Sequence, residues 1–67
     1  MAMKVRTIRE WTDDELRVQI EQARRELFNL RMQSTAGQLE RPSRIREVRR
    51  DLARMETVRS ERRRAKS

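Results

Sequence analysis

Arginine is the residue with which this chain could do chemistry, and most of it lies in the second half of the sequence. Residues 41–67 contain eleven basic and four acidic side chains, and ten of the basic ones are Arg, so this half carries the whole net charge of +7. Arginine presents a planar fork of donors that binds phosphate through two hydrogen bonds and also stacks on bases. The second half is therefore expected to bind a polyanion, and its arginine bias favours nucleic acid.

The spacing of these arginines predicts a helix with two different faces. Four of them recur at helical intervals: Arg46, Arg49, Arg50 and Arg54. Apolar residues recur at the same intervals but out of phase: Ile45, Val48, Leu52 and Met55. At 100° per residue the two sets centre roughly 165° apart around a helix. One face would be buried against protein and the other would meet phosphates. The alternative is an ordinary solvated face, although such faces usually mix both signs of charge.

A second helix is predicted upstream, and its start is marked by several agreeing signals. Thr12 and Glu15 have the spacing of a capping box, in which each side chain bonds a backbone N–H at the helix start. Trp11 and Leu16 have the spacing of a hydrophobic staple. The acidic run that begins at Asp13 places negative charge at the positive end of the helix dipole. The first long helix is therefore predicted over about residues 13–34.

The two helices are expected to fold back on each other as a single all-α domain over residues 1–67. The first helix carries a narrow apolar seam: Leu16, Ile20, Ala23, Leu27 and Leu30. Gly37 suits a helix end and Pro42 the first turn of the next helix, which predicts a loop over about 35–41 and a second helix over about 42–65. Two seams joined by a short loop bury each other only as an antiparallel two-helix hairpin.

The two ends of the chain carry weaker patterns. Val5, Ile8 and Trp11 recur every three residues, which suggests a short N-terminal helical turn within Met3–Glu10 that folds onto the hairpin. After Val58 the seam positions hold cations: Arg59, Arg62 and Lys66. Residues 60–67 are therefore expected to form a frayed basic tail that orders only against phosphate.

Two groups of residues leave alternatives open. Phe28 and Met32 lie off the first seam, so either the N-terminal segment covers them or they form an exposed patch for a neighbouring protein or an unstacked base. Gln33, Thr35 and Gln38 surround the hairpin tip, where they serve either the turn itself or contacts with folded RNA.

Composition excludes several classes of function. The chain has no Cys and no His, which removes thiol chemistry, imidazole catalysis and the usual zinc sites, so we expect no cofactor, no metal and no enzyme activity. It has no apolar run long enough to span a bilayer and no signal-peptide core, so a cytoplasmic location is expected. Since 43% of residues are charged, the isolated protein is expected to be marginally stable and to gain stability from a partner.

Two rival functions use the same patterns. The apolar seams could pair between chains as a coiled coil, but each spans only about two heptads, which is short for a stable dimer. The arginine face could bind a membrane surface, but bulky aromatic anchors are missing from its apolar side.

Two blocks of sequence resemble a known family. They are Glu26–Gln33 (ELFNLRMQ), and Gly37-Gln38-Leu39 followed by the Arg44-Ile45-Arg46, Val48-Arg49-Arg50 and Ala53-Arg54 groups. Over about residues 4–60 the chain is similar to the bacterial ribosomal large-subunit protein twenty-nine family. The basic residue Arg41 before Pro42 is a mild departure from the family pattern.

The resemblance implies a structural constituent of the large ribosomal subunit, a helical hairpin without catalytic activity. Its implied partners are large-subunit ribosomal RNA, the universal large-subunit protein twenty-three near the exit of the nascent-peptide tunnel, and the chaperones and targeting factors that bind there. No membrane and no small-molecule substrate are implied. Carried over by position, the implied RNA-binding residues are Arg31, Gln38, Arg44, Arg46, Arg49, Arg50 and Arg54.

Overall fold

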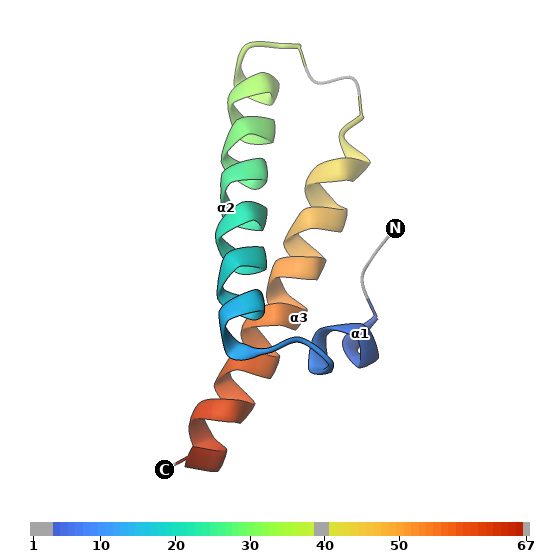
Figure 1. The fold of residues 1–67 in the computed structure, drawn as a ribbon. Helices are drawn as coiled ribbons and strands as arrows, with labels where there is room; N and C mark the ends of the chain where they lie inside the picture. Colours follow the sequence, from blue (N-terminus) through green and yellow to red (C-terminus); the bar gives the residue numbers. More distant parts are fainter. Residues whose placement is uncertain (1–3, 39–40, 67) are drawn as a thin grey trace.

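Three helices make up the computed structural model, which describes residues 4–38 and 41–66. They are α1 (Val5–Arg9), α2 (Asp13–Thr35) and α3 (Ser43–Lys66). α2 and α3 pack against each other in opposite directions, and α1 lies against α3 (Figure 1). The predicted all-α hairpin with a short N-terminal helical turn is confirmed, although Met3, at the predicted start of that turn, lies outside the described residues.

The start of α2 follows from the signals in the sequence. The Thr12 side-chain oxygen accepts a hydrogen bond from the Glu15 backbone N–H at 3.1 Å, which is one of the two bonds of the predicted capping box. Asp13, Asp14 and Glu15 occupy the first turn. Trp11 packs against the core cluster that contains Leu16, as the staple predicts. The cap fixes the point at which α2 begins, and with it the position of this acidic turn.

The end of α2 is set by Gly37, which has a φ of 71° in the left-handed region that glycine adopts without strain. The Gly37 N–H donates to the Ser34 carbonyl at 3.1 Å and the Gln38 N–H donates to the Gln33 carbonyl at 2.8 Å. This pair of bonds is the Schellman motif, which satisfies carbonyls left free at a helix end. The backbone of the tip therefore serves the turn. Leu39 and Glu40, within the predicted loop, lie outside the described residues.

The core lies between the two seams and under α1. Its fully buried members come from all three helices: Ile8, Leu16, Ile20, Met55 and Val58. Trp11, Ala23 and Leu52 pack against them. Leu27 and Val48 are also buried, at 8% and 3% exposure. The apolar seams are thus occupied within one chain, which is the arrangement of a hairpin rather than of a coiled coil between chains.

The C-terminal turns of α3 have polar partners that the sequence did not predict. α3 continues to Lys66. Arg62 donates to the Asp13 carboxylate at 2.9 Å and to the Trp11 carbonyl at 2.7 Å. Lys66 donates to the other Asp13 oxygen at 3.0 Å. Fraying of residues 60–67 in solution stays a prediction, but residues 60–66 are helical here and attached to the start of α2; Ser67 lies outside the described residues.

Candidate nucleic-acid interface

The outer face of α3 presents exposed arginines without internal partners. Arg46, Arg49 and Arg50 of α3 are all exposed to solvent. Within residues 4–38 and 41–66, none of the three has an ion pair or a side-chain hydrogen bond. A guanidinium that is not already paired with a carboxylate binds phosphate without the free-energy cost of breaking an ion pair first.

Arg31 of α2 belongs to the same surface. Arg31 and Arg49 line a shallow depression between the two long helices, whose apolar lining includes Leu27, Leu52 and Ala53. Arg31 is exposed, and among the described residues its side chain has no ion pair. Arg46 is a helical neighbour of both Arg49 and Arg50, three and four positions along α3. We call these four predicted residues the arginine surface: Arg31, Arg46, Arg49 and Arg50.

Arg44 lies elsewhere and connects the two long helices. One of its nitrogens contacts both Glu26 carboxylate oxygens, at 2.5 and 2.9 Å, and another donates to Glu47 at 3.1 Å. These hydrogen bonds, from Glu26 first and then from Glu47, raise the pKa of Arg44, and the bond from Arg44 lowers the pKa of Glu47. Arg44 lines a groove with Val48 and Asp51, on a different side of α3 from the depression that Arg49 lines. The structure thus gives Arg44 a role in joining α2 to α3.

Arg54 differs from the arginine surface in its pairing and burial. Its side chain is 38% exposed, and one guanidinium nitrogen lies 3.8 Å from the carboxylate of Asp51. That nitrogen is buried without a hydrogen-bond partner. Asp51 is itself buried at 7% exposure, so its attraction to Arg54 acts where water screens charges poorly. Only part of the Arg54 guanidinium therefore faces solvent at the edge of the arginine surface.

Gln38 lies at the tip, where the sequence left two alternatives open. Its backbone N–H serves the helix end, as described above, while the residue as a whole is exposed. Thr35 donates its hydroxyl hydrogen to the Arg31 carbonyl at 3.0 Å. Turn chemistry thus uses the backbone of Gln38 and the hydroxyl of Thr35, and it leaves the Gln38 side chain in solvent.

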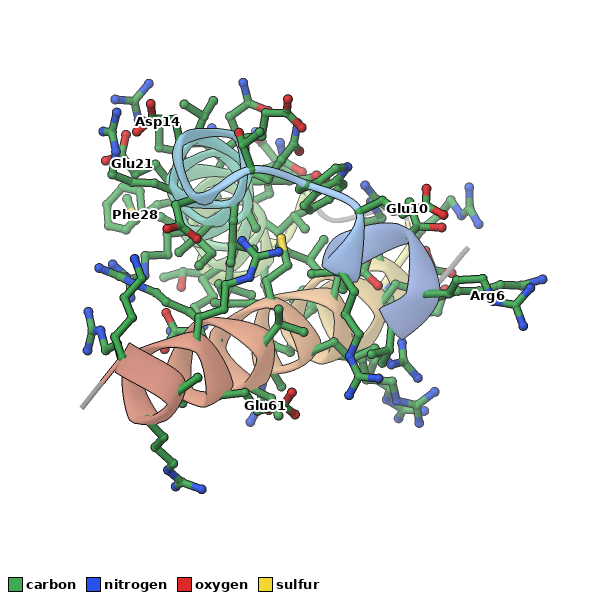
Figure 2. The ribbon with its side chains drawn as sticks, turned by 60° about the horizontal axis from the view of Figure 1, so that its bottom comes forward. Arg6, Glu10, Asp14, Glu21, Phe28 and Glu61 are labelled. Atoms are coloured by element: carbon green, nitrogen blue, oxygen red, sulfur yellow. The ribbon has the colours of Figure 1, made fainter. Side chains whose placement is uncertain are left out.

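The N-terminal segment does not cover Phe28 and Met32. These side chains are 63% and 56% exposed, and Val18 on the same helix is 40% exposed. Figure 2 shows Phe28 beside Glu21 on the side of α2 opposite α1. α1 packs instead on α3, where Ile8 is fully buried. Of the two alternatives for this pair, the structure therefore shows the exposed patch.

Sequence reasoning missed the ion pairs between helices. Arg24 of α2 contacts Glu56 of α3, and Arg9 of α1 lies 3.4 Å from Glu61 of α3. Only the pairs of Asp13 with Arg62 and Lys66 had a signal in the sequence, because an antiparallel arrangement places the acidic first turn of α2 opposite the basic last turns of α3. Within residues 4–38 and 41–66, no group of acidic side chains is arranged to hold a metal ion, and none of the helices is both long and apolar enough to cross a membrane.

Comparison with known proteins agrees with this architecture. A family model described as Ribosomal L29 protein matches residues 6–62. The chain is 47% identical over 62 residues to the large ribosomal subunit protein uL29 of Zymomonas mobilis, covering 92% of each chain. It is 53% identical over 60 residues to the uL29 proteins of Desulforudis audaxviator and Bacillus cytotoxicus, covering 90% of this chain and 90% and 91% of theirs. With most of its length matched, the chain belongs to the ribosomal L29 protein family.

Proposed function

We propose that this protein is a structural constituent of the large ribosomal subunit and that it binds large-subunit ribosomal RNA through the arginine surface. The observation that carries the RNA contact is that the four arginines of this surface are exposed without ion pairs among the described residues, and that Arg31 of α2 and Arg49 of α3 line the same depression. Other arginines of the hairpin are paired with carboxylates, among them Arg24 and Arg44. As a member of a ribosomal protein family the chain is not an enzyme, and it acts in the cytoplasm as part of the ribosome.

The mechanism is electrostatic and geometric. Each arginine that neutralises a phosphate releases condensed counterions, which favours binding at low salt and weakens it at high salt. The packed core between α2 and α3 fixes the helix positions from which the arginines project, so binding does not have to order one helix relative to the other. Arg54 at the edge and Gln38 at the tip extend the contact, and Arg44 contributes only by giving up part of its bonding to Glu26 and Glu47.

The finer placement follows the family resemblance. We propose a position near the exit of the nascent-peptide tunnel, beside the universal large-subunit protein twenty-three and within reach of chaperones and targeting factors. The exposed pair Phe28 and Met32 is our candidate for the contact with a neighbouring protein, because both side chains are more than half exposed and Phe28 lies on the side of α2 opposite α1.

Binding to purified large-subunit ribosomal RNA over a range of salt concentrations tests the proposal. We expect the logarithm of the affinity to fall linearly with the logarithm of the salt concentration, with a slope of about −3 from the arginine surface and a steeper total if other cations contribute. A slope near zero would exclude phosphate contacts as the basis of binding and overturn the proposal.

A further inference from the structure

A second cluster of cations lies at the open end of the hairpin, apart from the arginine surface. A hollow of about 250 Å³, open to solvent, lies between the first turns of α2 and the last turns of α3. Five basic side chains line it: Arg17, Arg59, Arg62, Arg63 and Lys66. Two carboxylates, Asp13 and Asp14, line it as well, so the formal charge of the lining is positive.

The hollow exists because α3 continues past the start of α2 (Figure 1). Up to Val58 the inner side of α3 packs on the apolar seam of α2. After Val58 the same side of the helix carries Arg59, Arg62 and Lys66, which face the start of α2 instead. The cations are therefore directed to the inside of the hairpin end by the same helical spacing that directs the core residues inward.

The carboxylate of Asp13 binds two of the cations that line the hollow. Its two carboxylate oxygens bind different cations, one Arg62 at 2.9 Å and the other Lys66 at 3.0 Å. Two non-bridging oxygens of a phosphate group accept hydrogen bonds from an arginine and a lysine in the same way. The Asp13 side chain is 60% exposed and Lys66 is 73% exposed, so a ligand in solvent reaches both.

Arg62 is held in place by groups other than Asp13. Its second terminal nitrogen donates to the Trp11 carbonyl at 2.7 Å and to the Arg9 carbonyl at 3.3 Å. Its side chain is 25% exposed, compared with 73% for Lys66, the other cation that pairs with Asp13. If Asp13 moves away, Arg62 keeps its orientation and still presents a donor to the hollow. A donor oriented in advance loses little freedom when it binds a ligand.

We propose that this hollow is a second phosphate-binding site, in which Asp13 occupies the place of a phosphate group in the free protein and a phosphodiester of RNA displaces it in the bound state. The RNA part of this inference rests on the proposed function, whereas the anion site depends only on the fold. The hairpin then holds RNA at two separate places, at the arginine surface along α3 and at the end where α2 begins.

The test is a titration of the ¹⁵N-labelled full chain with inorganic phosphate, followed by nuclear magnetic resonance at constant ionic strength. We expect saturable shifts of the signals of Arg59, Arg62 and Lys66. Asp13→Asn removes the competing charge and keeps the size of the side chain, and we expect it to tighten phosphate binding roughly fivefold. Arg59→Gln combined with Lys66→Gln should weaken binding by a similar factor. The second variant leaves the start of α2 unaltered, so the test does not depend on the folding of Asp13→Asn.

The matched control is Arg49→Gln combined with Arg50→Gln, which removes the same charge from the arginine surface and should leave the shifts in the hollow unchanged. Shifts confined to the arginine surface, or equal phosphate affinity in the parent chain and in Asp13→Asn, would overturn the anion site.

A second titration uses a short single-stranded RNA and distinguishes the sources of the phosphate. Shifts of the same three residues at lower concentrations than inorganic phosphate requires support a phosphodiester ligand. Binding of inorganic phosphate without any RNA effect in the hollow would overturn the RNA part. If ribosomal RNA binds with the expected salt slope while the signals of Arg59, Arg62 and Lys66 do not shift, this inference fails and the proposed function stands.

Discussion

Removing two neighbouring cations from the arginine surface is the most informative perturbation. Arg49→Gln combined with Arg50→Gln eliminates two of the four arginines that the structure gathers there. Each neutralised phosphate contributes about 0.7 to 0.9 to the salt slope, the lower value for single strands and the higher for duplex. The variant should therefore reduce the magnitude of the slope by about 1.4 to 1.8.

This change in the salt slope corresponds to a change in affinity that a binding assay can measure. Between about 50 and 200 mM salt, two phosphate contacts account for an affinity loss of roughly 7- to 12-fold, which the variant should no longer show. Both side chains are exposed, and Gln has nearly the helix propensity of Arg, so stability should change by no more than about 0.5 kcal/mol. Filter binding to large-subunit ribosomal RNA measures the slope, and circular dichroism checks the fold.

A matched control separates a specific surface from net charge. Arg6→Gln combined with Arg25→Gln removes the same charge from two exposed positions that also have no ion pair among the described residues. These positions lie on α1 and α2, outside the arginine surface, so the slope should change much less. An equal reduction by both variants would show that only net charge matters, and that would refute the assignment of the surface.

Three further predictions concern what holds the hairpin together. Met55→Ala should lower the free energy of unfolding by about 2 to 5 kcal/mol in urea, because Met55 is fully buried where the three helices meet; a loss below about 1 kcal/mol would contradict this packing. Thr12→Ala should cost about 0.5 to 2 kcal/mol by thermal unfolding, because it removes the helix cap, whereas Thr57→Ala removes only a bond within α3 and should cost less. The hydrogen bond from Lys66, followed by that from Arg62, lowers the pKa of Asp13 below its usual 3.8, so this contact stabilises the fold above that pH and is lost as the pH falls through the lowered pKa. Acid unfolding below about pH 4 should therefore be less steep in Asp13→Asn, and identical acid unfolding curves would contradict the contact.

The two long helices and their pairing could be read from the sequence because the signals for them are local. Each signal depends on residues only a few positions apart. In the structure Thr12 caps the start of α2, Gly37 follows its end in the left-handed conformation, and the seam residues form the core. Two seams joined by a short connection have one simple way to bury each other. The hairpin therefore followed from patterns that need no knowledge of distant neighbours.

The partners of the arginines could not be read in the same way. Arg44 has the same residue type and helical context as Arg46, yet it lies toward Glu26, eighteen positions away, while Arg46 faces solvent. A long charged side chain pairs with whichever carboxylate the folded chain places within reach. Since each ion pair at the surface contributes little energy, the sequence carries no strong signal for a particular pair. The RNA-binding set implied by resemblance thus contains residues that share a face and others, such as Arg44, that do not.

The packing of α1 was also beyond the sequence. The interval between Val5, Ile8 and Trp11 suggested a turn, but it did not say which face of the hairpin the turn would cover. In the structure Ile8 is fully buried on the α3 side and Val5 is 37% exposed. Phe28 and Met32 stay exposed as a result.

Sedimentation of a cell lysate on sucrose gradients at low and high salt, with this protein followed by an antibody, tests whether the protein is held in the large ribosomal subunit by phosphate contacts. We expect the protein to sediment with the large ribosomal subunit and to stay there through a moderate salt wash. The Arg49→Gln, Arg50→Gln variant should leave the subunit at lower salt than the parent chain. Recovery of the parent chain only in the light fractions would show that it is not a constituent of the large subunit.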